Sequence, residues 1–479
     1  MTAMAKLAVL GIDVGTSGVR AVAVSSGGEL FAETDQPLRR DHREAGGIHE
    51  QDPAEWWQAV CSVVRRVIAS VKQSSGEVDL GGVAITGTSG TLLVADTEGH
   101  PLRPAILYDD GRGAEIAEGL NQLSGALSVR LGPSFSLVKA LWVQRHQPEV
   151  WERTRYILHP ADWLTGKLCG EFGVSDFTNA LKLGYDPETR SWNESVRAGG
   201  LLDHRLPAVR RPGEPIAQVS TSAAAETGLP PHTPVLAGAT DGMASVIASG
   251  ASRLGDANTT LGTTLVWKVL HDGKPAARSG VYFHLHPGGL WVPGAASNTG
   301  LGSVSQTTSP EEMDRSAVNY LPTPVVCYML RGEGERFPFA RSNAGSFVEG
   351  SPRNAAEAYA AQLQSVAFVE RWGYEILADC GVRAGDTVFS TGAAAKSPVL
   401  SQLRANTLGR TVVLPRSPTA AFGAAILAAT GTEFAGDIFH AIQSMTGILE
   451  TFTPSADLVP AFDAIYKSFR SACARRGYS

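Results

Sequence analysis

With 479 residues, 43% of them hydrophobic and 18% charged, the chain can bury substantial cores, which excludes a disordered or fibrous protein. The 47 acidic residues outnumber the 41 basic ones, and the net charge of −6 excludes a predominantly basic nucleic-acid-binding protein. Five widely spaced cysteines without a CxxC pair exclude a zinc ribbon or disulfide scaffold and suit a reducing compartment. With no signal-peptide core at its start and no apolar stretch long enough for a bilayer, the chain is expected to be soluble and cytoplasmic.

The first predicted elements form a meander of three strands over residues 6–36. The first strand ends near Asp13, a turn follows at Gly15-Thr16-Ser17-Gly18, and β-branched residues resume over 19–24. A P-loop or a dinucleotide-binding loop needs a helix after its glycines, and neither GxxxxGK[ST] nor GxGxxG occurs in this segment. The turn is therefore predicted to join two strands.

A helix is predicted next, with Asp52 as its N-cap and Pro53 at its first position, and it continues to about Val71. A buried strand over 82–86 leads into a small polar loop that contains Ser89, and a further strand follows over 92–95. The region up to about residue 182 is expected to mix helical and irregular structure.

The second half of the chain repeats the arrangement of the first. A strand over 234–240 ends at Asp241, a helix follows, and a hairpin over 255–270 carries the turn Gly262-Thr263. Long helices over about 354–380 and 397–408 complete an α/β architecture.

Three segments are predicted from this order. An N-terminal domain at 1–237 would contain the first Gly-Thr hairpin, and a C-terminal domain at 238–434 would contain the second. The remaining segment, 435–479, is expected to be helical and to pack on the first domain.

Two Gly-Thr turns in separate halves suggest phosphate binding, because turn N–H groups and hydroxyls can hold phosphate oxygens without a lysine. The predicted phosphate contacts are Thr16, Ser17, Gly262 and Thr263. Asp13 can hold Mg²⁺ directly or through water, and Asp241 can take the proton of a hydroxyl that attacks a γ-phosphorus. Each turn alone fits an ordinary hairpin, and each aspartate fits an ordinary cap. Both turns together, with Asp241 between them, favour phosphoryl transfer.

A third feature is a strand over 386–391, a turn of small residues and a helix with Ser397 as its N-cap. Small side chains would let a flat base approach the backbone, and the predicted nucleotide contacts there are Gly392, Ala393 and Lys396. A second small-residue helix start at 415–425 could line the same pocket, although both could be plain close-packed helix entries. His284 and His286 alternate on one strand face, but they have no third metal ligand at a diagnostic spacing.

In their order and spacing, several motifs resemble the FGGY carbohydrate kinases. The matching stretches are residues 11–17, 50–57, 101–112, 238–241 and 392–397. Further stretches, at 87–91, 179–185, 294–298 and 331–338, resemble the D-ribulose kinases of cyanobacteria and plant plastids, the latter often labelled xylulose kinase-like. The loop Gly87-Thr88-Ser89-Gly90 departs from the Gln-Met/Gln-His-Gly pattern of ordinary xylulokinases, which argues against a common D-xylulose kinase.

The resemblance implies an α/β, two-domain actin-like ATPase fold, shared by sugar kinases, heat-shock ATPases and actin, with a cleft between the domains. It implies that Asp13 lies near Mg²⁺ and the transferred phosphate, that Asp241 is the catalytic base, and that Ser89 contacts the sugar beside these two aspartates. The same analogy places Thr16 and Gly262-Thr263 on the phosphates and Gly392 on the nucleotide.

Two departures from the family pattern concern the nucleotide side. Ala393 and Ala394 stand where glycines are usual, and Thr419 stands where a Glu is usual. These departures put the affinity or preference for the nucleotide in question, whereas the residues for phosphoryl transfer are intact.

The sequence therefore predicts an ATP- and Mg²⁺-dependent pentulose kinase that makes D-ribulose 5-phosphate from D-ribulose. D-xylulose or another ketose or polyol is the alternative acceptor. A non-catalytic sugar or nucleotide sensor on the same fold is a third hypothesis, supported only by the substituted glycines. The expected partners are a ketopentose and ATP, without nucleic acid or membrane, and the oligomeric state is left open.

Overall fold

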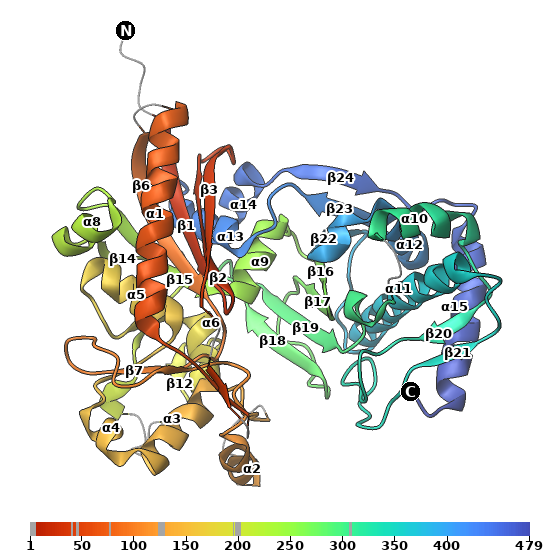
Figure 1. Ribbon diagram of the computed structural model, residues 1–479, viewed down its shortest axis with the longest axis horizontal. Coiled ribbons are helices and arrows are strands. Elements are labelled where there is room, and N and C mark those ends of the chain that lie inside the picture. Colours follow the sequence, from red (N-terminus) through yellow and green to blue (C-terminus); the bar gives the residue numbers. More distant parts are fainter. Residues whose placement is uncertain are drawn as a thin grey trace. The chain divides into compact units, whose positions relative to one another are not determined.

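The computed structural model describes residues 6–39, 42–44, 47–75, 78–122, 130–194, 196, 203–305 and 309–479. Their elements belong to two compact units (Figure 1). The first unit consists of residues 1–248 and 419–445, and the second of residues 249–418 and 446–479. Each unit is built around one large mixed β-sheet.

The sheet of the first unit has the strand order β14-β15-β6-β1-β2-β3. Its strands are β1 (Lys6–Val14), β2 (Gly18–Val24), β3 (Leu30–Pro37), β6 (Val78–Gly87), β14 (Pro215–Gln218) and β15 (Pro234–Thr240). β1, β2 and β3 form the predicted antiparallel meander, β6 runs parallel to β1, and β15 runs parallel to β6. The carboxyl ends of β1, β6 and β15 therefore meet at one edge of the sheet.

The two faces of this sheet are covered by different helices. Because side chains alternate along a strand, Leu10 and Ile12 of β1 pack in one core with helix α1 (Pro53–Ser75) and helix α5 (Pro160–Cys169). Gly11 lies on the opposite face, where helix α13 (Ala420–Thr432) approaches so closely that a Cβ on Gly11 would stand 1.9 Å from the Ala421 carbonyl oxygen. The small residues that open α13 are thus explained by its contact with the sheet.

Further short elements surround this sheet. The helices are α2 (Ala114–Gln122), α3 (Ser136–His146), α4 (Pro148–Arg153), α6 (Phe177–Ala180), α8 (Thr221–Thr227), α9 (Asp241–Ser249) and α14 (Ile438–Met445). The small sheets pair β4 (His42–Glu44) and β8 (Ala105–Ile106) with β5 (Ile48–Gln51), β7 (Leu93–Ala95) with β9 (Tyr156–Leu158), β10 (Val174–Asp176) with β13 (Ala208–Arg210), and β11 (Tyr185–Asp186) with β12 (Ser191–Trp192).

The sheet of the second unit has the order β18-β19-β17-β16-β22-β23-β24. Its strands are β16 (Ala257–Leu261), β17 (Leu265–Val269), β18 (Val281–Leu285), β19 (Trp291–Ser297), β22 (Thr387–Thr391), β23 (Thr411–Pro415) and β24 (Ile448–Phe452). The remaining elements are β20 (Val326–Tyr328), β21 (Phe347–Glu349), α10 (Pro310–Ala317), α11 (Ala355–Asp379), α12 (Pro398–Leu408) and α15 (Val459–Arg475). The hairpin of β16 and β17 carries the second predicted Gly-Thr turn.

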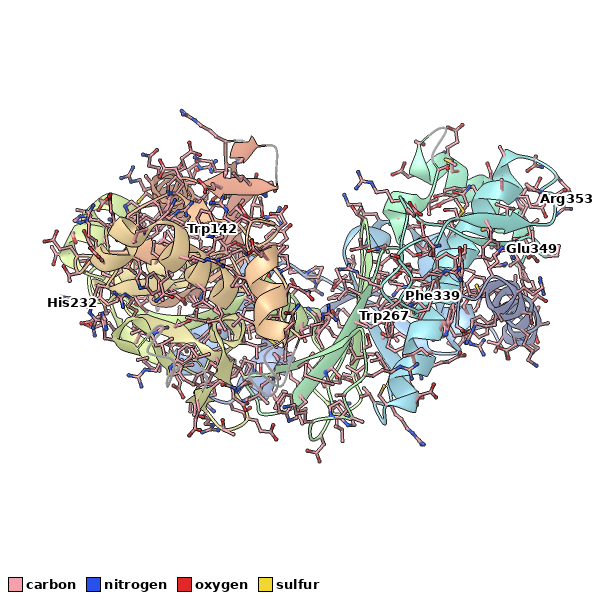
Figure 2. The ribbon with its side chains drawn as sticks, turned by 90° about the horizontal axis from the view of Figure 1, so that it is seen from below. Trp142, His232, Trp267, Phe339, Glu349 and Arg353 are labelled. Atoms are coloured by element: carbon pink, nitrogen blue, oxygen red, sulfur yellow. The ribbon has the colours of Figure 1, made fainter. Side chains whose placement is uncertain are left out.

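Aromatic side chains fill the core of the second unit. Trp267 of β17 is fully buried and donates its indole N–H to the Glu370 carbonyl oxygen of α11 at 2.9 Å. Its ring meets that of Phe337 edge-on at 5.2 Å, and Phe339 packs 5.6 Å from Trp372. Figure 2 labels Trp267 and Phe339 among these side chains.

The division into units differs from the predicted boundaries at 237/238 and 434/435. Residues 419–445 return to the first unit because α13 packs against its sheet. Residues 446–479 belong to the second unit, where α15 buries Phe462 and Phe469, whereas the sequence analysis placed them on the first domain. None of the helices in the described ranges combines the length and hydrophobicity needed to cross a bilayer.

Candidate active site

Two of the predicted catalytic residues lie at the shared edge of the first sheet. Asp13 sits near the end of β1 and pairs in register with Thr86 of β6. Thr86 in turn pairs with Ala239 of β15, two residues before Asp241. Although they are 228 positions apart in the chain, the two aspartates therefore lie at the same edge of the sheet, Asp13 near the end of β1 and Asp241 directly after β15, with β6 between these strands. Open α/β sheets commonly bind ligands at this edge.

The environment of Asp13 disfavours its charge. Burial is the largest cause that raises the pKa of Asp13, to about 7, and the negative charge of Asp241 acts in the same direction. A hydrogen bond from the Thr86 hydroxyl to Asp13 Oδ1, at 3.1 Å, and the charge of Arg20 oppose this shift. The interaction of the two carboxylates makes the site attractive to a cation.

Asp241 is held where β15 passes into helix α9. Its Oδ1 accepts the N–H of Gly242 at 2.6 Å, and its carbonyl oxygen accepts the Ser245 hydroxyl at 2.8 Å. The N–H of the preceding residue, Thr240, donates to the Thr178 hydroxyl of α6 at 2.9 Å. The backbone at the base of Asp241 is thus fixed by its own helix and by α6.

Asp176 organises helix α6 from its N-cap position. Its Oδ1 accepts the Thr178 N–H and hydroxyl at 2.7 and 2.5 Å, and its Oδ2 accepts the Asn179 side-chain amide at 2.6 Å. Complete burial and the charge of Asp162 raise the pKa of Asp176 to about 6, and these hydrogen bonds oppose the shift. A line of contacts therefore runs from Asp176 through Thr178 to the end of β15.

The small polar loop after β6, residues 87–91, is held by two lysines. The Lys139 ammonium, which is fully buried, donates to the Gly90 carbonyl oxygen at 2.7 Å and to the Tyr108 carbonyl oxygen at 3.2 Å. The partly buried Lys182 donates to the Ser89 carbonyl oxygen at 3.2 Å. Burial lowers the pKa of both lysines, that of Lys139 to about 7, and the charge of Asp241 counteracts the shift at Lys182.

Lys182 thus connects this loop electrostatically with Asp241. Among the described residues, the Lys182 ammonium donates one hydrogen bond, to the Ser89 carbonyl oxygen. Two of its three N–H groups are therefore left for a ligand. In the same ranges the Ser89 hydroxyl makes no hydrogen bond, and the residue is partly exposed. Ser89, Lys182 and Asp241 together can recognise a hydroxylated molecule.

Gly90 is required at its place in this loop. Its φ of +84° is unfavourable for other residues, and a Cβ there would stand 2.2 Å from the Ser134 carbonyl oxygen and 2.8 Å from Lys182 Cδ. The missing side chain therefore allows Lys182 to lie against the loop.

The first predicted phosphate turn joins β1 and β2. The Gly15 N–H donates to the Gly18 carbonyl oxygen at 3.0 Å and closes the turn. Ser17 is exposed and Thr16 is partly exposed. Neither hydroxyl makes a hydrogen bond to another described residue, so both can donate to an anion.

The predicted nucleotide contacts lie in the second unit on two adjoining turns. Gly262 and Thr263 form the turn between β16 and β17, and Gly392 follows β22, which runs parallel to β16. Gly392 has a φ of +86°, and a Cβ there would stand 2.7 Å from the Leu261 carbonyl oxygen, so the two turns touch. The structure brings these three residues together, whereas their contacts with a nucleotide stay a prediction.

The two alanines on this turn, Ala393 and Ala394, differ in their surroundings. Ala394 is completely buried in the core of the second unit, whereas Ala393 and Lys396 are exposed. Only Ala393 therefore presents its methyl group to a ligand on this turn. Thr419 belongs to the first unit, where its hydroxyl caps α13 by accepting the Phe422 N–H at 3.2 Å.

Two other features contribute nothing to this site. His286 is fully buried, which lowers its pKa to about 3, and its Nδ1 accepts the Gly288 N–H at 3.0 Å.

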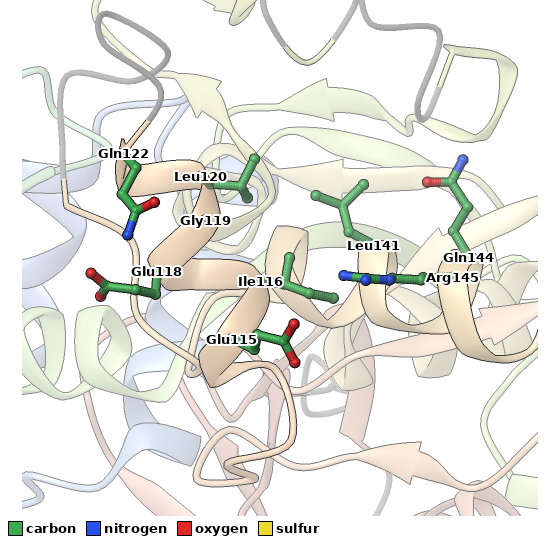
Figure 3. A pocket seen from close by; sticks show the side chains of 9 residues that line it. All are labelled: Glu115, Ile116, Glu118, Gly119, Leu120, Gln122, Leu141, Gln144 and Arg145. Carbon is green, nitrogen blue, oxygen red and sulfur yellow. The ribbon is translucent and has the colours of Figure 1, made fainter.

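Within the described ranges, no group of three or more His, Cys, Asp or Glu side chains could hold a metal ion. An open groove of about 570 Å³ between α2 and α3 contains none of the predicted site residues; Figure 3 shows its lining residues, among them Ile116, Leu141 and Arg145.

The residues that support the site from a distance could not be predicted from the sequence. Lys139, Lys182 and Asp176 occur in segments without a general chemical motif, and Lys182 was noted only within a stretch of family resemblance. A lysine among otherwise apolar residues, as at 137–143, was the one available signal for Lys139.

Known protein families and sequences resemble this chain over most of its length. The model of the N-terminal domain of the FGGY family of carbohydrate kinases matches residues 8–248, and the model of the C-terminal domain matches residues 294–432. The xylulose kinase of Staphylococcus epidermidis is 26% identical over 98% of this chain and 99% of its own length. That of Streptomyces rubiginosus is 30% identical over 70% of this chain and 69% of its own.

Solved structures show the same fold. The xylulose kinase of Rhodospirillum rubrum has a TM-score of 0.86 at 24% identity, covering 98% of both chains. The glycerol kinase of Plasmodium falciparum with ADP has a TM-score of 0.87 at 17% identity, also covering 98% of both chains. The predicted two-domain actin-like ATPase fold is thereby confirmed, whereas the cleft expected between its domains stays a prediction.

Proposed function

Because this chain belongs to the FGGY family of carbohydrate kinases, we propose that it is an ATP-dependent pentulose kinase that phosphorylates the 5-hydroxyl of D-ribulose. The observation that carries the proposal is that Asp13 and Asp241 lie at the same sheet edge and interact through their charges, with Ser89 connected to Asp241 through Lys182. This is the set of groups that phosphoryl transfer to a sugar alcohol requires.

Asp241 is the proposed general base. As the hydroxyl oxygen of the sugar attacks the γ-phosphorus, its proton passes to the Asp241 carboxylate, the new O–P bond forms, and the bond to the β-phosphate oxygen breaks to release ADP. General-base action contributes about 10²–10⁴-fold to the rate. The hydrogen bond from Gly242 and the fixed Thr240 backbone hold the carboxylate in place for this proton.

Asp13 is the proposed Mg²⁺ ligand. The residues present fit this ion, because Mg²⁺ prefers oxygen ligands and the charge of Asp241 already disfavours an uncompensated carboxylate at Asp13. Mg²⁺ often takes only one or two carboxylates and completes its shell with substrate phosphates and water. When bound, the ion neutralises charge on the transferring phosphate.

The phosphates and the nucleotide are assigned to the turns of both units. Thr16 and Ser17 offer N–H groups and hydroxyls in the first unit, and Gly262 and Thr263 are the proposed phosphate contacts in the second. The proposed contacts to the rest of the nucleotide are Gly392, Ala393 and Lys396. The net charge of the chain is negative and does not attract the anionic nucleotide. The exposed Lys396 supplies a local positive charge for it.

The proposed sugar contacts are Ser89, Lys182 and the two aspartates. The Ser89 hydroxyl can donate or accept, and the Lys182 ammonium can donate to a hydroxyl or ketone oxygen. Since the charge of Lys182 is balanced by Asp241, the pair suits an uncharged sugar better than a sugar acid.

D-xylulose is the second candidate acceptor, because the similar proteins in Staphylococcus epidermidis and Streptomyces rubiginosus are named xylulose kinases. Coupled measurement of ADP release across D-ribulose, D-xylulose, other ketoses and polyols separates the two. The proposal predicts the highest kcat/KM with D-ribulose, and a preference for D-xylulose would contradict the acceptor assignment. ATP binding without turnover on any sugar would instead favour the sensor hypothesis.

A further inference from the structure

Two carbonyl oxygens of the first phosphate turn, those of Thr16 and Ser17, accept hydrogen bonds from donors outside the turn. The Gln51 side-chain amide donates from Nε2 to the Thr16 carbonyl oxygen at 2.7 Å. The Leu38 N–H donates to the Ser17 carbonyl oxygen at 3.1 Å. Both donors lie in the same compact unit as the turn.

These contacts determine where the turn directs its N–H groups. In a trans peptide, the N–H points away from the carbonyl oxygen of the same peptide plane. The bond from Gln51 to the Thr16 carbonyl oxygen therefore turns the Ser17 N–H to the opposite side, where it makes no hydrogen bond with another described residue. An N–H group directed in this way, beside two hydroxyls, is a ready donor to a phosphate oxygen.

The orientation of the Gln51 amide is itself determined by a neighbour. The Trp56 indole N–H, buried in helix α1, donates to Gln51 Oε1 at 3.0 Å. Since Oε1 accepts from Trp56, Nε2 must face the turn, and the opposite orientation would place two donors together. Gln51 is itself buried, at the end of β5, and among the described residues its side chain bonds only to Thr16 and Trp56.

We propose that Gln51 is a positioning residue for nucleotide binding: its amide, oriented by Trp56, holds the Thr16 carbonyl so that the Ser17 N–H faces the ATP polyphosphate. The inference rests on the proposed function, since it assigns the first turn to the phosphates of ATP. Gln51 acts through the turn and touches neither substrate.

The test compares two substitutions at Gln51 with the same substitutions at Gln58, an exposed residue on helix α1. Gln51→Met removes the amide without adding charge, and Gln51→Glu keeps an acceptor for Trp56 but no donor for Thr16. Calorimetry gives the Kd of the full-length protein for ATP with Mg²⁺, and steady-state kinetics give the KM for ATP and for the sugar. Thermal unfolding shows whether each variant is folded.

Loss of one buried hydrogen bond is expected to raise the Kd and the KM for ATP about tenfold in both Gln51 variants, with the KM for the sugar nearly unchanged. The Gln58 variants should match the wild type. Trp56→Phe should give a smaller loss, and adding it to Gln51→Met should cause no further loss, because both changes act on one line of contacts.

Wild-type affinity for ATP in Gln51→Met would overturn the inference. So would a loss confined to Gln51→Glu, which charge repulsion alone explains, or an equal rise of the KM for ATP and for the sugar. A wild-type protein that phosphorylates no sugar would contradict the proposed function, whereas the Kd for ATP would still decide the role of Gln51.

Discussion

Replacing Lys182 by methionine tests how the acceptor is recognised. The substitution keeps most of the length of the side chain but removes the ammonium that donates to the Ser89 carbonyl oxygen and interacts with the charge of Asp241. Methionine can still fill the space against Gly90, so the loop should keep its course. The change therefore isolates the charge and its hydrogen bonds.

The expected loss follows from the bonds that disappear. A hydrogen bond from a charged donor contributes about 1.5–3 kcal/mol, which corresponds to about 10–150-fold in kcat/KM for the sugar. Because no ATP contact is assigned to Lys182, the KM for ATP should stay within about twofold of the wild type. Lys182→Arg keeps the charge but not the compact geometry, and it should recover only part of the activity.

Coupled ADP release with D-ribulose and D-xylulose measures both parameters. Lys167→Met is the matched control, because Lys167 is a partly buried lysine of the same unit whose ammonium lies over the Trp57 ring at 5.1 Å. An unchanged kcat/KM for both sugars in Lys182→Met would refute the reasoning. So would a loss of the same size in the control.

Two further variants test the charges around the strand ends. The pKa of Asp176 is raised to about 6, so the folded protein holds this proton more tightly than the unfolded chain, and stability falls as pH rises from about 4 to about 6. Asp176→Asn removes this titrating carboxyl and with it the pH dependence that the carboxyl causes. Between about pH 5 and pH 8 the urea midpoint of the variant should therefore fall less than that of the wild type, by the equivalent of about 1 kcal/mol. Parallel pH profiles of the two proteins would contradict this prediction. Asp13→Asn should weaken ATP binding at least about tenfold in the presence of Mg²⁺ but little in its absence, measured by calorimetry. Equal losses in both conditions would remove Asp13 from the metal site.

Local patterns predicted the elements well. The glycines between two β-branched runs indicated the hairpin of β1 and β2, and its antiparallel pairing is confirmed. The N-cap of α12 was also predicted, and Ser397 Oγ accepts the Leu400 N–H at 3.0 Å. Such features depend on neighbours a few residues away, which the sequence displays directly.

Contacts between distant segments could be predicted only in part. The order of the motifs suggested that Asp13 and Asp241 converge, but nothing local indicated that the charges of Lys182 and Asp241 interact or that α13 returns to the first sheet. The same limit applies to Ala394, because whether its methyl faces a ligand or the core depends on packing by helices far away in the chain. These facts depend on tertiary packing, which hydrophobic periodicity does not specify.

The most direct test of the account is Asp241→Asn, assayed for ADP release with D-ribulose and for sugar binding by calorimetry. If Asp241 is the base, kcat should fall by about 10²–10⁴-fold, while the Kd for the sugar changes little because asparagine keeps the size and one oxygen of the side chain. A variant that turns over D-ribulose at the wild-type rate would contradict the central claim.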